Sequence, residues 1–167
     1  GEEVLKHPYG LALRTVNDRV TVLVAEWLGH RVSEWNMDGT RVRTVCGTGQ
    51  IGSDEEQLTH PSDVVVLPQL GHIVVADIKI ADSNYNRICV FHDCGRFLYS
   101  FAESTLFHPC ALAVDAQDHI IILDHEKDIH VYDSQGAHMC THDDLYLLKG
   151  PKGMEWIGGE GGRLYIV

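Results

Sequence analysis

The sequence is poor in the features that most nucleic-acid-binding and membrane proteins require. Its 13 Lys and Arg stand against 24 Asp and Glu, which gives a net charge of −11. This balance argues against sequence-independent binding of nucleic acid, because such affinity comes from cations that neutralise phosphates. The sequence contains no apolar run of membrane length and no signal peptide. It therefore predicts a protein that does not bind membranes and for which RNA is a disfavoured partner.

Cysteine is scarce and irregularly spaced. The five cysteines are odd in number and form no Cys-x-x-Cys pair, so they indicate neither a disulfide scaffold nor a zinc site of that kind. They are Cys46, Cys89, Cys94, Cys110 and Cys140. Free thiols are typical of a reducing compartment, so we expect a cytoplasmic protein.

Helical periodicity is also missing. No window keeps the 3.6-residue apolar period long enough for a helix. Short apolar runs alternate instead with turn signals, of which Asp38-Gly39 is a strong one because Gly adopts positive φ without strain. The sequence therefore predicts an all-β fold.

One phrase occurs three times and opens a fourth. Each full copy begins with His-Pro, continues through apolar runs that end in an acid, and closes with an aromatic residue four positions before a Gly. The copies begin at His7, His60 and His108, and the fourth opens at Gly150-Pro151. The closing aromatics are Trp35, Phe91 and Tyr132. Repeats of roughly 40 to 50 residues, each a set of four short antiparallel strands, predict the blades of a β-propeller.

We expect one domain with blades over about 5–57, 58–105 and 106–147 and a half blade over 148–167. Three and a half blades leave an incomplete ring with exposed edges, which propellers avoid by closing. We expect the chain to be a fragment whose remaining blades belong to a longer parent chain. A second copy that completes a seven-bladed ring is an alternative, and a small natural or designed propeller is another. In the second unit both Val75-Ala76-Asp77 and Ile80-Ala81-Asp82 fit the end of the second strand, so this unit carries about five extra residues. We expect them to form a protruding loop, and a shifted strand is the alternative.

A family resemblance lies in the second copy. The segment 81–91, preceded by His60-Pro61 and followed by Asp93-Cys94-Gly95, resembles the NHL repeat of six-bladed β-propellers. The likeness covers nearly the whole chain, although Glu26 stands where the family usually has Asp and the third copy has no matching Asn. It implies a non-catalytic module that recognises a protein partner, such as the substrate-binding end of a ubiquitin ligase or scaffold protein. Single-stranded RNA binding is the first alternative function, and the activity of a metal-dependent lyase or hydrolase is the second alternative.

Three histidines invite a metal-site hypothesis. His7, His60 and His108 recur at one repeat position near the expected channel, where three imidazoles could hold zinc or could simply pack between blades. Amidating lyases, which resemble NHL propellers, carry their zinc-binding His directly after the Pro. Those positions here are Tyr9, Ser62, Cys110 and Lys152. The resemblance therefore implies no metal, no cofactor and no lyase activity.

Other catalytic patterns are weak. Ser62 and Cys110 lack a Gly-x-Ser-x-Gly elbow or a Cys-His family signature. The acids that end the second strands are expected to cap loops by accepting backbone N–H groups. These acids are Glu26, Asp77, Asp82 and Asp124.

The best binding candidates lie in the loops that the propeller would gather on one face. Exposed aromatics beside Arg are typical of protein interfaces and of base-stacking sites alike. The loop-face candidates are Trp27, His30, Arg31, Tyr85, Asn86, Arg87, His125 and Lys127. The channel-ring candidates are Tyr9, Ser62, Cys110 and Lys152. For Arg31 and Arg87 a structural role is the alternative, in which they bond to carbonyls or an acid of a neighbouring blade.

Overall fold

The structure is a computed structural model that describes the 167 residues except 1–3, 80–85, 104, 127, 144–152 and 159–160. The described part consists of β-strands and one short 3-10 turn, η1 (Trp27–Gly29). The predicted all-β fold is confirmed. No helix in these described ranges is long and apolar enough to cross a membrane.

The strands form three four-stranded antiparallel sheets and one two-stranded sheet, each in sequence order. The first sheet holds β1 (Pro8–Val16), β2 (Arg19–Glu26), β3 (Arg31–Asn36) and β4 (Arg41–Cys46). The second holds β5 (Pro61–Val66), β6 (Ile73–Asp77), β7 (Arg87–Phe91) and β8 (Phe97–Phe101). The third holds β9 (Ala111–Val114), β10 (Ile120–Leu123), β11 (Ile129–Tyr132) and β12 (His138–His142). The last holds β13 (Met154–Ile157) and β14 (Arg163–Ile166).

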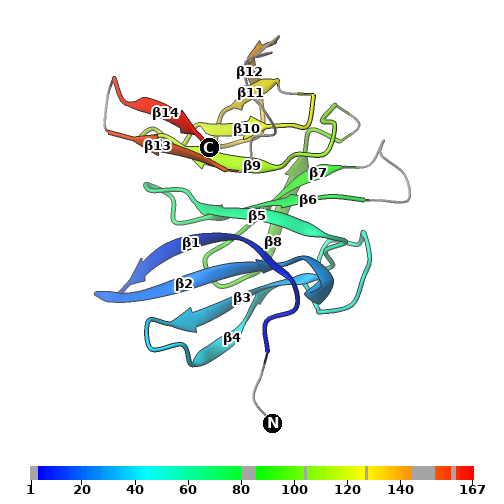
Figure 1. The fold of residues 1–167 in the computed structure, drawn as a ribbon, viewed down its shortest axis with the longest axis vertical. Coiled ribbons are helices and arrows are strands. Elements are labelled where there is room, and N and C mark those ends of the chain that lie inside the picture. The colour runs from blue at the N-terminus through cyan, green and yellow to red at the C-terminus, as the bar shows by residue number, and fades with distance from the viewer. Residues whose placement is uncertain (1–3, 80–85, 104, 127, 144–152, 159–160) are drawn as a thin grey trace.

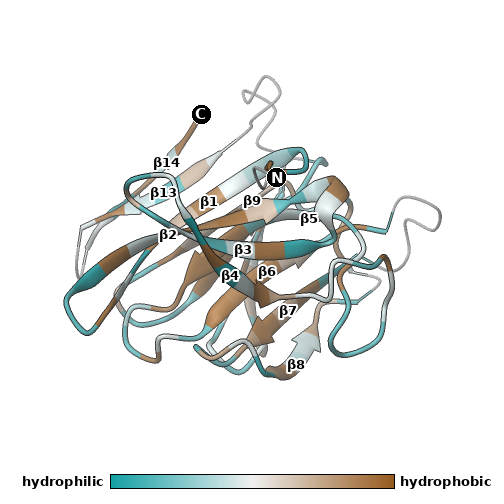
Figure 2. Cartoon of the chain, turned by 90° about the horizontal axis from the view of Figure 1, so that it is seen from below, coloured by the Kyte–Doolittle hydropathy of each residue, from teal (hydrophilic) through white to brown (hydrophobic). Residues whose placement is uncertain are grey.

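Figure 1 shows these sheets stacked face to face in chain order, so that each repeat is one blade of an open fan. Each pair of neighbouring blades encloses an apolar cluster. On β6, Val75 faces the cluster shared with the first blade and Val74 faces the one shared with the third. Successive strand residues point to opposite faces, which explains why β6 and β10 are apolar at nearly every position. Figure 2 shows the same concentration of hydrophobic residues on the strands.

Glycine turns close the third-strand hairpins as the sequence predicts. Gly39, Gly95 and Gly136 follow β3, β7 and β11 with φ of 85°, 95° and 82°. Each donates its N–H to the carbonyl three residues earlier. At Gly95 a Cβ would lie only 2.0 Å from the carbonyl oxygen of Val45. The turn of the second blade is therefore pressed against β4 of the first.

The structure shows where two strands of the predicted repeat begin or end. The strand β6 ends at Asp77, the first of the two acids that fit the repeat there. The predicted protruding loop falls on residues outside those described and stays a prediction. The strand β9 begins two residues after Pro109, whereas β1 and β5 begin at their prolines.

The ring formed by the described strands is open. A hollow of about 520 Å³ runs along the first strands of all four sheets. On β1, Tyr9, Leu11 and Leu13 are 56%, 65% and 63% exposed, while the alternate residue Ala12 packs against the core with the second blade. The fan thus keeps an uncovered apolar row along its first strand.

Candidate interaction face

The second strand of each complete blade ends in a buried acid that holds the chain leading into the same blade. The acid is 0–2% exposed in all three blades. Glu26 accepts the N–H of Lys6 (2.9 Å), Asp77 that of Thr59 (2.7 Å) and Asp124 that of Phe107 (3.3 Å). This is the capping role that the sequence predicts for these acids. Asp82, the other predicted cap, lies outside the described residues.

Each acid also contacts a cation or imidazole of its own blade. The pairs are Arg31 Nε to Glu26 Oε1 (3.0 Å), Arg87 Nε to Asp77 Oδ2 (3.2 Å) and His130 Nε2 to Asp124 Oδ2 (3.2 Å). We call each such set of acid, backbone N–H and cation or imidazole a polar clasp. The structural role predicted for Arg87 is confirmed through carbonyls of the preceding unit, those of Ser53 and Gln57. The acid that Arg31 and Arg87 contact belongs to their own blade and not to a neighbour, because each Arg begins the strand paired with that acid.

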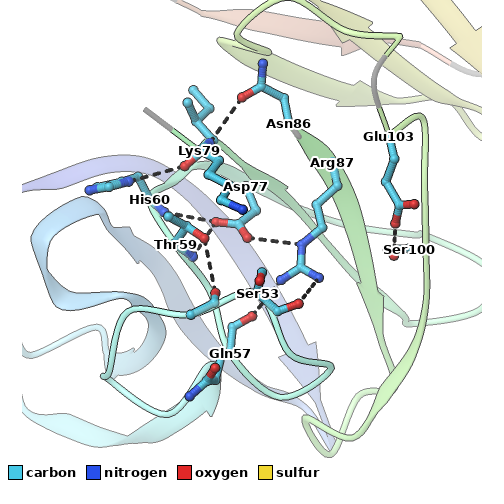
Figure 3. Close-up of polar contacts among 12 residues, drawn as sticks. Ser53, Gln57, Thr59, His60, Asp77, Lys79, Asn86, Arg87, Ser100 and Glu103 are labelled. Atoms are coloured by element: carbon cyan, nitrogen blue, oxygen red, sulfur yellow. Dashed lines mark hydrogen bonds and ion pairs between the residues drawn. The ribbon is translucent and has the colours of Figure 1, made fainter. Parts of the chain in front are cut away.

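Arg87 also makes hydrogen bonds outside its polar clasp. It donates to the carbonyls of Ser53 (2.8 Å) and Gln57 (2.9 Å), in the loop that joins the first blade to the second. Figure 3 shows the guanidinium between Asp77 and this loop. All of these partners are structural, so the side chain of Arg87 is occupied in holding the fold.

The clasp carboxylates are stabilised in their ionised form in the first and third blades. Burial alone would raise the pKa of Glu26, but hydrogen bonds from Arg31, Ser33 and the Lys6 amide, together with the Arg31 charge, lower it below its usual value. For Asp124, burial is likewise outweighed by His130 and by two backbone N–H groups, so its pKa is lowered. Carboxylates held in this way are poor general acids or bases. Asp77 of the second blade differs, because burial outweighs the Arg87 charge and its hydrogen bonds and raises its pKa to about 6.

Near the start of the first two blades, five aromatic and imidazole rings lie in a continuous row. The ring centroids of successive members are 5.5 Å apart for His7 and Tyr9, 4.9 Å for Tyr9 and Trp27, 5.0 Å for Trp27 and His60, and 5.4 Å for His60 and His30. We call these five residues the aromatic face. Tyr9 and Trp27 are stacked at 27°, and Tyr9 is 56% exposed. The face therefore presents a preformed aromatic surface to solvent.

Backbone contacts fix these rings in place. The N–H of Trp27 bonds to the carbonyl of His7 (3.0 Å), which ties η1 to the start of β1. The imidazole of His60 contacts the carbonyl of Ile78 through Nδ1 (3.2 Å), and that of His30 contacts the carbonyl of Thr59. Burial lowers the pKa of His60, and the neighbouring His30 adds to this effect against the hydrogen bond to Ile78. His60 thus favours the neutral form, which suits stacking.

The third blade carries a smaller version of this arrangement. The ring of Phe107 stacks on His108 at 5.0 Å and 14°, and His108 meets His125 edge-on at 6.0 Å. Phe107 is 44% exposed. Sequence analysis missed Phe107, although an aromatic directly before His-Pro at a predicted loop was a usable signal.

Several predicted binding residues are buried instead of exposed. Asn86 and Arg87 are 0% and 9% exposed, and Asn86 donates to the carbonyl of Leu106 (3.1 Å). Both were expected on the loop face, but their polar groups are bonded to the protein. The expectation that they contact a partner is therefore corrected.

The channel-ring residues bind neighbouring backbone. Ser62 is 5% exposed and donates to the carbonyl of Pro109 in the next blade (2.8 Å). Cys110 is half-buried, its thiol contacts the carbonyl of Leu123 (3.4 Å), and burial raises the pKa of this thiol to about 11. Ser62 therefore belongs to a contact between blades, and neither side chain is placed as a nucleophile.

The remaining candidates divide into two groups. Trp27, His30 and Arg31 are half-buried at the first blade, and His125 is exposed at the third. Tyr85, Lys127 and Lys152 lie outside the described residues. The structure thus brings together Tyr9, Trp27 and His30, which sequence analysis had assigned separately to the channel ring and the loop face.

The three repeated histidines serve as ring contacts. His7 and His60 belong to the aromatic face, and His108 stacks on Phe107. Neither of the two groups of potential ligand atoms found among the described residues contains any of them. The geometry gives no support to a zinc ring at this position.

Comparison with known proteins agrees with the architecture. No family model matches the sequence. Over 117 residues the chain is 28% identical to Protein brain tumor of Drosophila melanogaster, an NHL-repeat protein, and the match covers 70% of this chain and 10% of that protein. The chain therefore spans about a tenth of the length of this relative.

Solved structures share the fold at low sequence identity. The structure titled as a nidogen/laminin complex matches with a TM-score of 0.71 and 21% identity, over 96% of this chain and 55% of that chain. Streptogramin B lyase matches with a TM-score of 0.62 and 14% identity, over 99% and 56%. BBS1N in complex with ARL6DN matches with a TM-score of 0.65 and 15% identity, over 93% and 46%. The chain spans about half of each.

The stacked four-stranded antiparallel sheets and these likenesses define the class: the chain is a partial β-propeller whose ring is incomplete. Its repeats resemble the NHL type, as the match to Protein brain tumor indicates.

Proposed function

We propose that the chain is a non-catalytic recognition module that presents its aromatic face to a protein partner. The observation that carries the proposal is the stack of the exposed Tyr9 on the half-buried Trp27, with ring centroids 4.9 Å apart. Large aromatic side chains held rigidly at a surface lose little entropy on binding and are enriched among the residues that dominate interface energy. In a larger protein, such a module would serve as the partner-binding or substrate-binding end of a scaffold or ubiquitin-ligase-like chain.

The occupied polar groups support a role without catalysis. The clasp carboxylates accept hydrogen bonds from backbone and cations, and Ser62 donates to backbone. A nucleophile needs an adjacent base within hydrogen-bond reach. Two of the structures with this fold are titled as complexes with another protein, whereas one is a lyase. The fold alone therefore does not decide whether the protein is an enzyme. The proposal of a non-catalytic role rests on the polar side chains that are already occupied by hydrogen bonds.

We also propose a cytoplasmic location for the protein. All five cysteines are free, and unpaired thiols persist most readily where glutathione keeps them reduced.

Single-stranded RNA is the second candidate, favoured by the NHL resemblance and by the stacked rings. Bases stack on aromatic side chains with little sequence preference, but a cationic groove must also follow the phosphates. Arg31 and Arg87, two of the cations expected to serve this purpose, are paired with Glu26 and Asp77. The net charge of −11 adds a general repulsion. We therefore favour a protein partner.

Site-directed crosslinking tests the proposal. A photo-crosslinking amino acid in place of Tyr9 should capture a partner that the same group in place of Met139, which is 52% exposed on β12, does not. With the purified partner, Tyr9→Ala and Trp27→Ala should each weaken binding about tenfold, equivalent to about 1.4 kcal/mol. Met139→Ala should leave the affinity unchanged. Unchanged affinity in both aromatic variants would refute the aromatic face as the contact.

The RNA alternative has its own measurement. At about 0.15 M salt, surface charges are screened beyond roughly 8 Å, and we expect only weak binding of an RNA pool. Submicromolar, sequence-selective binding that Trp27→Ala abolishes would make RNA recognition the better assignment.

A further inference from the structure

Three consecutive residues in the turn between β7 and β8 bring together three kinds of metal-ligating atom. Ligand atoms of His92, Asp93 and Cys94 all lie within 4.8 Å of one another. The Nδ1 atom of His92 is 2.6 Å from Asp93 Oδ1 and 3.2 Å from Cys94 Sγ. Zinc holds N, O and S ligands at about 2.0–2.3 Å, which places neighbouring ligands ~3.5 Å apart in a tetrahedron. Small side-chain adjustments would open the three atoms to this spacing.

A fourth potential ligand lies beside the turn. The ring of His72, just before β6 in the same blade, has its centroid 5.9 Å from that of His92. Two imidazoles that share one tetrahedral zinc have centroids about 5–6 Å apart, given the zinc–nitrogen bond length. The Nδ1 atom of His72 is buried and has no hydrogen-bond partner among the described residues. A buried nitrogen without a partner is costly, and coordination would satisfy it once the ring turns toward His92.

The backbone of the turn is held in place by the first blade. Arg14 donates to the carbonyl of Asp93 (2.7 Å), and Arg43 reaches the carbonyl of Cys94 (3.5 Å). Within the turn, the N–H of Gly95 bonds to the carbonyl of His92 (2.8 Å). Ligands on a fixed backbone lose less entropy when an ion binds. The two arginines reach main-chain carbonyls here and do not occupy the potential ligand atoms. Those atoms contact one another, and His92 Nδ1 also accepts the N–H of Cys94 (3.3 Å), a hydrogen bond that zinc would replace.

We propose that His92, Asp93 and Cys94, with His72 as the fourth ligand, form a zinc site at the junction of the first two blades. A mixed set of imidazole, carboxylate and thiolate suits a borderline-soft ion with tetrahedral coordination. Calcium and magnesium need six or more oxygen ligands, which this turn does not offer. The sequence-based expectation of no metal rests on the residues after each Pro and takes no account of this turn.

The other group of potential ligands is less suited to a metal. It consists of Asp124, Asp128 and His130. The carboxylate of Asp124 already accepts the N–H groups of Phe107 and Asp128 and contacts His130. This group is the polar clasp of the third blade, and its role there is structural.

Metal titration of the intact 167-residue chain tests the proposal. Zinc added against a competing chelator should bind with a stoichiometry of one per chain. Cobalt(II) as a spectroscopic probe should give the intense visible absorption of a tetrahedral ion together with a thiolate-to-cobalt charge-transfer band. Cys94→Ser and His92→Ala should each lower zinc affinity at least tenfold, and Cys94→Ser should remove the charge-transfer band. His72→Ala should lower the affinity about tenfold.

Cys140→Ser provides the matched control, because Cys140 is likewise an exposed thiol with a histidine, His142, nearby (3.8 Å). It should leave zinc binding unchanged. In the unmodified chain, zinc should slow alkylation of Cys94 and leave that of Cys140 unaffected, which tests the site even if a variant misfolds. Absence of one-to-one binding, an octahedral cobalt spectrum, equal alkylation of the two thiols, or loss of zinc on Cys140→Ser would each overturn the proposal.

Discussion

Single glycines determine how closely neighbouring blades approach. Gly39 and Gly95 occupy the same turn position in successive blades, with φ of 85° and 95°. A Cβ at Gly39 would meet nothing within 4 Å, whereas at Gly95 it would lie 2.0 Å from the carbonyl oxygen of Val45. The two sites therefore share one backbone requirement and differ in their packing.

Alanine substitutions at Gly39 and Gly95 can therefore separate two costs in stability: the strain of the left-handed backbone and the clash between blades. Alanine at either position costs roughly 1–2 kcal/mol for the left-handed conformation. Gly95→Ala must also displace β4, and overpacking of this kind costs a further 1–3 kcal/mol or so. We expect urea unfolding to show a clearly larger loss of stability for Gly95→Ala than for Gly39→Ala. Equal losses would mean that the turn moves freely away from the first blade.

A buried carboxylate on β3 contacts side chains from the other three strands of the first blade. Glu34 is 6% exposed, accepts hydrogen bonds from Thr21 (2.8 Å) and Arg43 (2.8 Å), and lies 3.5 Å from Arg14. Burial alone would raise the pKa of Glu34, but the hydrogen bonds and the two arginine charges lower it below its usual 4.5. Because the folded pKa is below the unfolded one, the resulting stability is present above pH 4.5 and is lost as the pH falls through the folded pKa.

Glu34→Gln should therefore destabilise the protein by about 3 kcal/mol at pH 7, since it leaves the buried charge of Arg14 uncompensated. The difference from the unmodified chain should shrink as the pH falls below 4.5. Chemical unfolding at several pH values measures this, with exposed Glu55→Gln as the control. A difference that stays constant down to pH 3 would contradict the assigned ionisation of Glu34.

Among the strands and loops, the connection between the first two blades depends on one side chain of β7. Arg87 bonds to the carbonyls of Ser53 and Gln57 as well as to Asp77. The equivalent Arg31 of β3 directs its hydrogen bonds to Glu26. The two arginines thus share a place in the clasp, and Arg87 alone of the pair bonds to this loop.

Arg87→Ala should loosen that loop. We expect amide hydrogen exchange in residues 52–58 to speed up at least tenfold, because local opening becomes easier when two of its carbonyl contacts are lost. Arg31→Ala should leave exchange in this loop unchanged while it weakens the start of β1. The same acceleration in both variants would show that the loop responds to general destabilisation.

The repeated phrase was sufficient to predict the strands, because alternation and glycine turns are local properties of the chain. Contacts between segments were harder to predict. Tyr9, Trp27 and His60 come from two strand starts and a 3-10 turn, and nothing in their spacing shows that they stack. Arg87 looks like a surface cation in sequence, but its burial depends on a loop 30 residues earlier.

At the scale of the whole molecule, the open fan leaves apolar surface and strand edges exposed that a closed ring would cover. The apolar row of Tyr9, Leu11 and Leu13 is open on β1, and the last sheet has two strands among the residues that the structure describes. Unpaired strand edges and uncovered apolar surface promote association. We expect light scattering coupled to size exclusion to show dimers or larger species. A monodisperse monomer with cooperative unfolding would contradict this expectation.

The polar clasp also has a consequence for how a propeller ring could evolve by duplication of its repeats. Its acid, the backbone N–H that it accepts and its cation or imidazole all come from one repeat, as Glu26, Lys6 and Arg31 do in the first. A gene duplication that copied one repeat would therefore copy a complete set of buried charges, with none left unpaired. Blade number could then change by whole units during evolution, and only the apolar faces between blades would need to adapt.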